Sequence, residues 1–124
     1  MDPAKNLIWN VRGLNSTSRQ DSVRFIVDSS RSDILCIQET KVTDMSCKII
    51  LSSLGSNFSD FIAAPSVGAS GGTLLAWRQH IGVSLARRVD NHNVTVQFST
   101  ENGPSWWLTR VYGPQGNDNK IQFL

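Results

Sequence analysis

The pattern of apolar residues in the first third of the chain predicts a βαβ unit. Residues 6–11 and 33–38 form short, nearly continuous apolar runs that end in polar or glycine residues, as is typical of buried strands. Between the runs, apolar residues recur at helical spacing and predict a helix over about residues 18–30, with a narrow apolar face of Val23, Ile26 and Val27. A strand, a helix and a strand in this order indicate helices packed over the face of a sheet.

Capping residues predict where the helices begin and end. Several residues that can cap a helix lie just before the first one, and Ser18 with Asp21 resembles a capping box. A second amphipathic segment predicts a helix over about residues 45–54, with Asp44 as its N-cap and Gly55 as its stop.

After residue 55 the pattern changes to short strand-like segments separated by turn residues. Their spacing predicts an antiparallel meander of Phe58–Ala64, Gly72–Arg78, Gly82–Val89, Val94–Ser99 and Trp106–Tyr112. Residues 117–124 resemble an N-cap and the first turn of a helix, so we expect the chain to end within an element.

The composition fits one folded domain. Of the 124 residues, 40% are apolar and 18% are charged, which is enough to bury a core and unlike a disordered chain. The formal charge of +2 permits a phosphate-bearing partner without requiring one. Two cysteines, no signal peptide and no long apolar run predict an intracellular protein with reduced thiols and no membrane contact. No obligate protein partner is evident from the sequence.

Glu39 is the strongest single candidate for a functional residue. It directly follows the apolar run 33–38, so it lies at the carboxyl end of a predicted strand, where α/β sheets present ligands. A carboxylate there suits Mg²⁺, which takes one or two carboxylates and keeps several waters. The alternative is an ordinary surface glutamate at the start of a loop.

Asn10 and Tyr112 are two further candidates at strand ends. The Asn10 amide can orient a phosphate or a carboxylate ligand, or it can simply begin the turn at Arg12-Gly13. The Tyr112 phenol can donate to a phosphoryl oxygen, or it can be an amphipathic residue that ends a strand.

Paired glycines follow Ser70 and lead into the apolar segment that begins at Thr73. Such a pair can form an anion-binding nest, but the segment is neither a P-loop nor a dinucleotide fingerprint. A tight turn into a buried strand is therefore the favoured interpretation of Gly71-Gly72.

Four blocks stand in a familiar order along the chain: Trp9-Asn10-Val11-Arg12-Gly13-Leu14, Ile34-Leu35-Cys36-Ile37-Gln38-Glu39-Thr40-Lys41, Ser70-Gly71-Gly72 and Val111-Tyr112-Gly113-Pro114. With them the chain resembles the N-terminal half of the endonuclease/exonuclease/phosphatase family. Within that family it looks most like the endonuclease domain of plant LINE-type (non-LTR) retrotransposons. The resemblance spans about residues 6–124, and its first two blocks are the most specific.

The resemblance implies the N-terminal half of a four-layer α/β sandwich, with a mixed, mostly antiparallel sheet and helices on one face. It implies phosphodiester hydrolysis that depends on Mg²⁺ or Mn²⁺. By matching motif, Glu39 would bind the metal, Asn10 would organise the site, and Tyr112 would contact the scissile phosphate. Lys41 would face the phosphate or support the metal ligand. DNA is then the implied partner and the nucleus the implied compartment.

The chain departs from the family because its second half is not matched. The family's Asp-x-Asn motif, which positions the nucleophile, and its terminal Asp-His pair have no counterpart in this sequence. We therefore expect residues 1–124 to be a partial domain that lacks its C-terminal half, with one of the two packed sheets mostly absent and strand edges left open.

Three functional hypotheses follow. The first is a truncated DNA endonuclease of a retrotransposon that is inactive alone, because the nucleophile-positioning groups are missing. The second is a non-catalytic remnant or module that binds nucleic acid or phosphate without turnover. The third is a phosphatase that acts on small phosphate esters. The mild basicity and the first sequence block favour nucleic acid over the third hypothesis.

Overall fold

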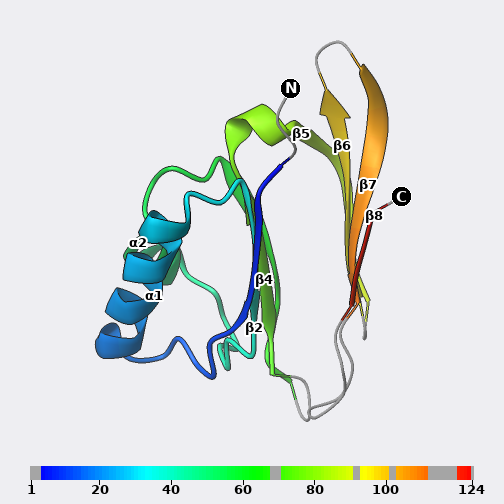
Figure 1. Ribbon diagram of the computed structural model, residues 1–124. Helices are drawn as coiled ribbons and strands as arrows, with labels where there is room; N and C mark the ends of the chain where they lie inside the picture. The colour runs from blue at the N-terminus through cyan, green and yellow to red at the C-terminus, as the bar shows by residue number, and fades with distance from the viewer. Residues whose placement is uncertain (1–3, 68–70, 91–92, 101–102, 112–119, 124) are drawn as a thin grey trace.

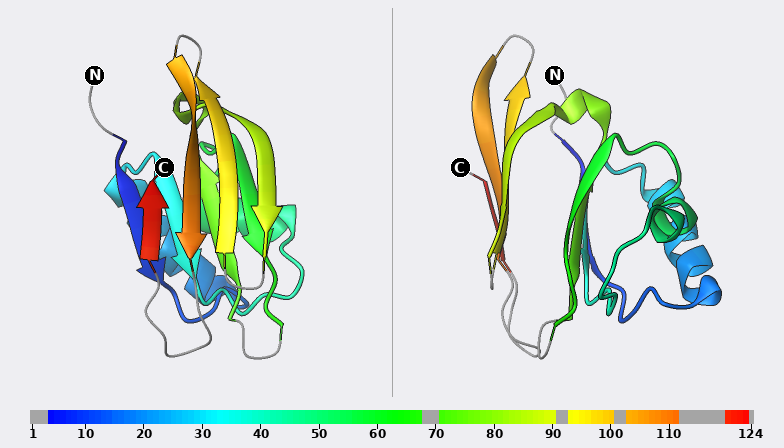
Figure 2. Two further views of the ribbon diagram at one scale, coloured as in Figure 1. Left: turned by 90° about the vertical axis from the view of Figure 1, so that its right-hand side faces the viewer. Right: turned by 180° about the vertical axis from the view of Figure 1, so that it is seen from behind.

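The computed structural model describes residues 4–67, 71–90, 93–100, 103–111 and 120–123. They form three layers: a pair of helices, a first sheet and a second sheet (Figure 1). Both helices cover one face of the first sheet, and the second sheet lies against the other face (Figure 2). No helix in the described part of the chain is long and apolar enough to cross a membrane.

The first sheet has the order β1-β2-β4-β3, formed by Asn6–Asn10, Ile34–Gln38, Thr73–Trp77 and Asp60–Ala64 respectively. Strands β1 and β2 are parallel, whereas β4 runs antiparallel to both β2 and β3. Asn10 pairs with Gln38, and Gln38 pairs with Thr73. The carboxyl ends of β1 and β2 therefore meet the amino end of β4 at one edge of the sheet.

The helices α1 (Thr17–Ser30) and α2 (Cys47–Leu54) confirm the βαβ unit. The Ser16 side chain caps α1. The prediction that Asp44 caps α2 is wrong. The helix begins two residues later than expected, because the Ser46 hydroxyl accepts a hydrogen bond from the backbone N–H of Ile49.

The helices bury one apolar face against the first sheet. Val23 and Val27 of α1 are buried there, but Ile26 is 39% exposed, so the apolar face is narrower than the sequence suggests. The sheet contributes Leu35, Ile37, Leu74 and Ala76 to this core. Burial of such side chains stabilises the fold by about 1.5–3 kcal/mol each.

The second sheet is antiparallel, with strands β5 (Val83–Val89), β6 (Asn93–Thr100), β7 (Gly103–Val111) and β8 (Lys120–Phe123) in that order. The predicted antiparallel meander is therefore confirmed within β3–β4 and within β5–β7, but it does not continue from β4 to β5. Strands β3 and β4 belong to the first sheet, and a short 3₁₀ turn (η1, Gln79–Ile81) carries the chain across to β5. Alternation of apolar and polar residues cannot distinguish one large sheet from two packed sheets, since both bury the same face of each strand.

Two expectations about the end of the domain are also corrected. The second sheet is not mostly absent, because four of its strands are present and residues of β6 and β7 pack against the first sheet. The described residues near the C-terminus, Lys120–Phe123, form β8 rather than a helical turn. They pair with β7 from Leu108 to Val111, because so short a helix is unstable by itself, whereas the free edge of β7 offers backbone donors and acceptors.

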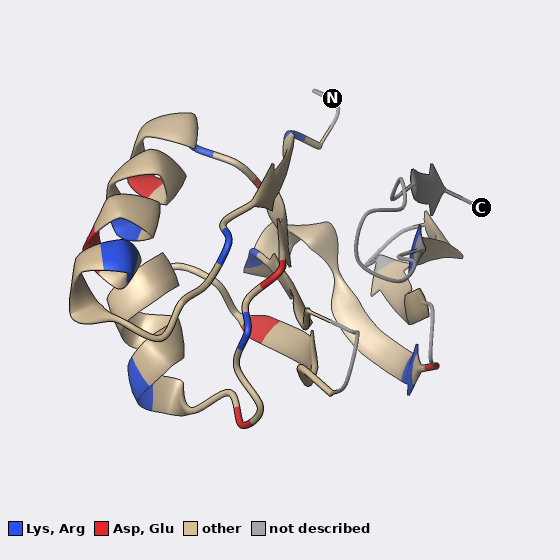
Figure 3. Cartoon of the chain, turned by 90° about the horizontal axis from the view of Figure 1, so that it is seen from below, with Lys and Arg blue, Asp and Glu red and all other residues tan. Residues whose placement is uncertain are grey.

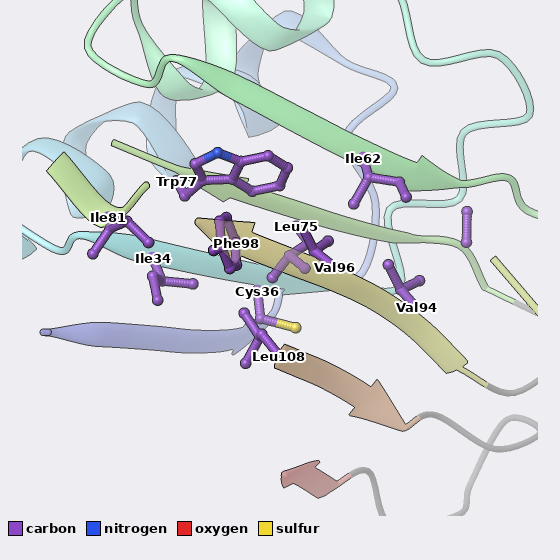
Figure 4. Close-up of a cluster of buried hydrophobic side chains, with 11 residues drawn as sticks. Ile34, Cys36, Ile62, Leu75, Trp77, Ile81, Val94, Val96, Phe98 and Leu108 are labelled. Carbon is purple, nitrogen blue, oxygen red and sulfur yellow. The ribbon is translucent and has the colours of Figure 1, made fainter. Parts of the chain in front are cut away.

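The core between the sheets is built around aromatic rings. Trp77 from β4 and Phe98 from β6 make an edge-to-face contact with ring centroids 5.0 Å apart, and Trp106 stacks on Phe98 at 4.6 Å. Aliphatic residues of both sheets, with Cys36, surround this cluster (Figure 4). Such aromatic contacts add about 0.5–1.5 kcal/mol beyond the area they bury.

Cys36 lies in this inter-sheet core and Cys47 lies on the surface. Burial raises the pKa of the Cys36 thiol to about 11, although the nearby Arg110 guanidinium lowers it in part. The Nε of Arg110, itself buried, donates a hydrogen bond of 2.7 Å to the Cys36 sulfur.

We predict that a thiol reagent at neutral pH modifies Cys47 quickly and Cys36 only after unfolding, because the thiolate is the reactive species. Mass spectrometry with and without denaturant measures the labelling. Fast labelling of Cys36 in the folded protein would contradict the burial described here.

Folding favours the protonated thiol of Cys36, because burial raises its pKa from 9.0 to about 11. Its contribution to the free energy of unfolding is therefore fully present below pH 9 and is lost as the pH rises towards 11.

Candidate functional site

Asn10, Glu39 and Lys41, three of the site residues predicted from the sequence, lie at the edge where β1 and β2 end and β4 begins. Asn10 is the last residue of β1, and Glu39 follows β2 directly. Lys41 lies two residues further along the same loop, and Gly71-Gly72 precede β4. Acidic and basic residues are interspersed along the loops at this end of the molecule (Figure 3).

Asn10 is exposed, and its side chain begins a turn. Its Oδ1 accepts a hydrogen bond of 3.1 Å from the backbone N–H of Arg12. This is the contact expected of a turn-initiating asparagine. It occupies one lone pair of the amide oxygen, and the amide NH₂ can still donate to an acceptor outside the chain. The turn and the proposed site role are therefore compatible.

Glu39 is half-buried and lies against the turn that precedes β4. A Cβ atom at position 71 would lie 3.1 Å from Glu39 Cγ and 3.3 Å from Glu39 Cα, so a glycine there lets the two loops approach. The adjacent Gly72 has φ +85°, and a Cβ on it would lie 2.5 Å from the Thr40 hydroxyl. The paired glycines thus let the segment before β4 pass close to Glu39 and Thr40.

Hydrogen bonds hold the loop that carries Glu39 on both sides. On the β1 side, the N–H of Leu14 donates to Thr40 O at 2.8 Å, and Asn15 Nδ2 donates to Lys41 O at 2.7 Å. On the β4 side, the N–H of Lys41 donates to Gly71 O at 2.7 Å. The short segment from Glu39 to Lys41 is therefore fixed between two neighbouring loops.

The same segment has an unusual backbone conformation. Glu39 has φ 53° and Lys41 has φ 56°, and Arg12 in the facing loop also has φ 56°. These left-handed conformations cost side-chain-bearing residues about 1–3 kcal/mol each and are found preferentially at functional sites. The fourth such residue in the described part of the chain is Arg31, the C-cap of α1. Nothing in the sequence marked these conformations, apart from the glycine that follows Arg12.

The structure does not test two parts of the predicted site, namely Tyr112 and a bound metal ion. Tyr112 and Ser70 lie outside the described residues. Within the described ranges, no group of three or more His, Cys, Asp or Glu side chains is clustered as a metal site. The ion pairs within the same ranges involve neither Glu39 nor Lys41.

Comparison with known proteins supports the fold. No family model matches the chain, and no curated protein matches it. Among solved structures, the chain is similar to the crystal structure of the AP endonuclease LMAP from Leishmania major, with a TM-score of 0.52 and 22% sequence identity. The match covers 77% of this chain and 35% of that one, so the chain spans about a third of the length of the structure it matches. The similarity shows that the chain shares part of the fold of that AP endonuclease, and it carries no feature specific to retrotransposons.

The left-handed backbone at Glu39 gives a test of this geometry. We predict that Glu39→Gly is more stable than Glu39→Ala by about 0.5–1 kcal/mol, because glycine relieves the strain at positive φ. At Asp21, an exposed position within α1, the order should reverse, with glycine less stable than alanine by about 1 kcal/mol. Urea unfolding of the four variants measures both differences. An alanine variant at position 39 as stable as the glycine variant would contradict the strained conformation.

Proposed function

We propose that this chain carries the metal- and phosphate-binding half of a DNA endonuclease that hydrolyses phosphodiester bonds. The observation that carries the proposal is the position of Glu39, whose left-handed backbone is held between the loops after β1 and before β4 by backbone hydrogen bonds of its neighbours Thr40 and Lys41. The fold that the chain shares with an AP endonuclease supports it. The sequence blocks around Asn10 and Glu39 further favour the endonuclease of a plant LINE-type retrotransposon.

The residues at this edge fit a divalent cation. Glu39 supplies one half-buried carboxylate with no ion-pair partner among the described residues, and Mg²⁺ commonly takes one or two carboxylates while it keeps several waters. When bound, Mg²⁺ or Mn²⁺ polarises a phosphoryl oxygen and stabilises the leaving oxygen. Glu39 would hold this cation.

The other residues of the site would bind and orient the substrate. The Asn10 amide NH₂ would donate to a phosphate oxygen or to a ligand of the cation while its oxygen keeps the turn at Arg12 in place. The Lys41 ammonium would neutralise charge on the phosphate. Tyr112 would donate its phenolic O–H to the scissile phosphate.

A binding module without turnover is the second candidate function. The Asp-x-Asn and Asp-His motifs that the family resemblance assigns to nucleophile positioning are absent from these 124 residues. Glu39 brings one carboxylate to the edge, which is enough to hold a cation and a phosphate but does not activate an attacking water by itself. Binding and hydrolysis therefore need separate tests.

We predict that the chain binds Mn²⁺ and that Glu39→Gln weakens this binding at least about tenfold, because the substitution removes the charged ligand. The electron paramagnetic resonance signal of free Mn²⁺ measures the bound fraction. Asp21→Asn, on the exposed face of α1, is the matched control and should leave the affinity unchanged. Equal affinities of the wild type and Glu39→Gln would refute the assignment.

Hydrolysis is tested on any version of the domain that nicks DNA. There, Glu39→Ala should abolish Mg²⁺-dependent conversion of supercoiled plasmid to the open circle, because a missing metal ligand removes charge stabilisation in the transition state. Gel electrophoresis of the plasmid measures the conversion. Nicking at the wild-type rate by this variant would show that Glu39 is no part of the catalytic site.

A further inference from the structure

A hollow of about 760 Å³ opens at the end of the sheets that is remote from Glu39. Strand β4 begins at the candidate site and ends at Trp77, and its five residues span about 17 Å. The turn η1 therefore lies at the end opposite the loop after β2 (Figure 1). The hollow, here called the Arg78 hollow, is lined by Arg78, Val83 and the polar residues Asn57, Gln79, His80 and Ser99. Its volume lies in the range of about 300–1,000 Å³ that is typical of pockets for small molecules.

The fold holds the guanidinium group of Arg78 on two sides. Its Nε donates a hydrogen bond of 2.7 Å to the backbone carbonyl of Ser32, a buried residue. Its Cζ lies 4.8 Å from the centre of the Phe58 ring, in a cation–π contact. The backbone N–H of Arg78 donates to Asp33 O at 3.0 Å, which fixes the start of the side chain. The guanidinium is therefore oriented before any ligand binds.

The two terminal nitrogens of Arg78 keep their hydrogen-bonding capacity. Within the described ranges, Arg78 forms no ion pair, and only its Nε donates to another residue from the side chain. The terminal nitrogens are not among the buried atoms without a partner, so both reach the solvent. Together they form the end-on fork with which an arginine binds a carboxylate or a phosphate through two hydrogen bonds.

No aspartate or glutamate in the described part of the chain lines the Arg78 hollow. Asp33 contacts one of the lining residues, but both of its carboxylate oxygens are engaged. Oδ1 accepts from His80 Nε2 at 2.9 Å, and Oδ2 accepts from the backbone N–H of Lys5 at 2.8 Å. An anion that enters the hollow therefore meets polar groups and an oriented arginine rather than a free carboxylate.

Val83 gives the hollow an apolar wall. It is the first residue of β5, it is 67% exposed, and it pairs with Ser99 of β6. An inorganic ion would satisfy Arg78 but would leave this wall and most of the hollow in contact with water. A molecule that carries an anionic group on an apolar body would use both, because burial of apolar surface adds to the charged hydrogen bonds.

We propose that the Arg78 hollow is a second binding site, which takes a small organic anion. The carboxylate or phosphate of the ligand accepts two hydrogen bonds from the terminal nitrogens of Arg78, and its apolar body lies against Val83. This inference does not rest on the proposed function, because Glu39 and the loops around it lie at the other end of β4.

The test is a titration of the full chain, followed by the backbone amide signals in NMR. The probes are benzoate and phenyl phosphate, which present the two anionic groups on the same ring, and benzamide is their uncharged control. EDTA is present throughout, so that no divalent cation binds at Glu39. We expect both anions to shift the amide signals of residues 78–83 in a saturable way, and benzamide to leave them in place. The tighter of the two anions identifies the group that the site prefers.

Two sets of variants separate binding from folding. Arg78→Gln should weaken binding about tenfold, because it removes the charged fork. Since Arg78 also contacts Ser32 and Phe58, a second pair leaves these contacts intact: Val83→Glu should weaken binding about fivefold, and Val83→Lys should strengthen it by a similar factor. Arg19→Gln, on the exposed first turn of α1, is the matched control and should leave the affinity unchanged. Circular dichroism verifies that each variant is folded.

Three results would overturn the proposal. The first is the absence of saturable shifts at residues 78–83 with both anions. The second is an equal response to benzamide, which would indicate an apolar contact alone. The third is the same affinity in Val83→Glu and Val83→Lys, or an equal loss in Arg19→Gln, which would indicate attraction by net charge. Because the Mn²⁺ experiment reports on Glu39 and this titration on the opposite end of β4, the two proposals fail separately.

Discussion

The candidate site depends on the register between β1, β2 and β4. This register places Asn10 beside Gln38 and Gln38 beside Thr73, so three loops leave the sheet at one edge. Hydrogen bonds from Leu14 to Thr40 and from Lys41 to Gly71 then join the loops. A shift of one residue would turn the side chains of a strand to the opposite face and break these bonds. The left-handed backbone at the site is maintained only because both neighbouring loops hold it.

Two cores fix that register from opposite faces of the first sheet. Leu74 and Ala76 of β4 pack under the helices, whereas Leu75 and Trp77 pack against the second sheet. Every residue of β4 is buried, so each position along the strand is specified by packing. Arg87 of β5 also links the two sheets, since it pairs with Asp60 and donates a hydrogen bond to the backbone carbonyl of Phe61, both on β3. A rigid scaffold of this kind can bear strain at its edge.

The sequence predicted the secondary structure better than the division into sheets. Continuous apolar runs identified β1 and β2, and the position of Glu39 after such a run identified the edge that carries the candidate site. The same rules predicted a meander that continues from β4 to β5, because a strand shows the same apolar pattern in one large sheet and in either of two packed sheets. Lys120–Phe123 was mistaken for a helix, since four residues carry no usable periodicity and their pairing with β7 is a long-range contact.

The central claim is that the edge around Glu39 is a cation and phosphate site, and paramagnetic relaxation measured by NMR tests it most directly. Sub-stoichiometric Mn²⁺ broadens the backbone amide signals of residues close to the bound ion. The account predicts that the signals of Glu39 and its two neighbouring loops, including Leu14 and Gly71, broaden first. Broadening that begins at the opposite end of the sheet, near Asp33 and His80, or that spreads evenly over the surface, would contradict the claim.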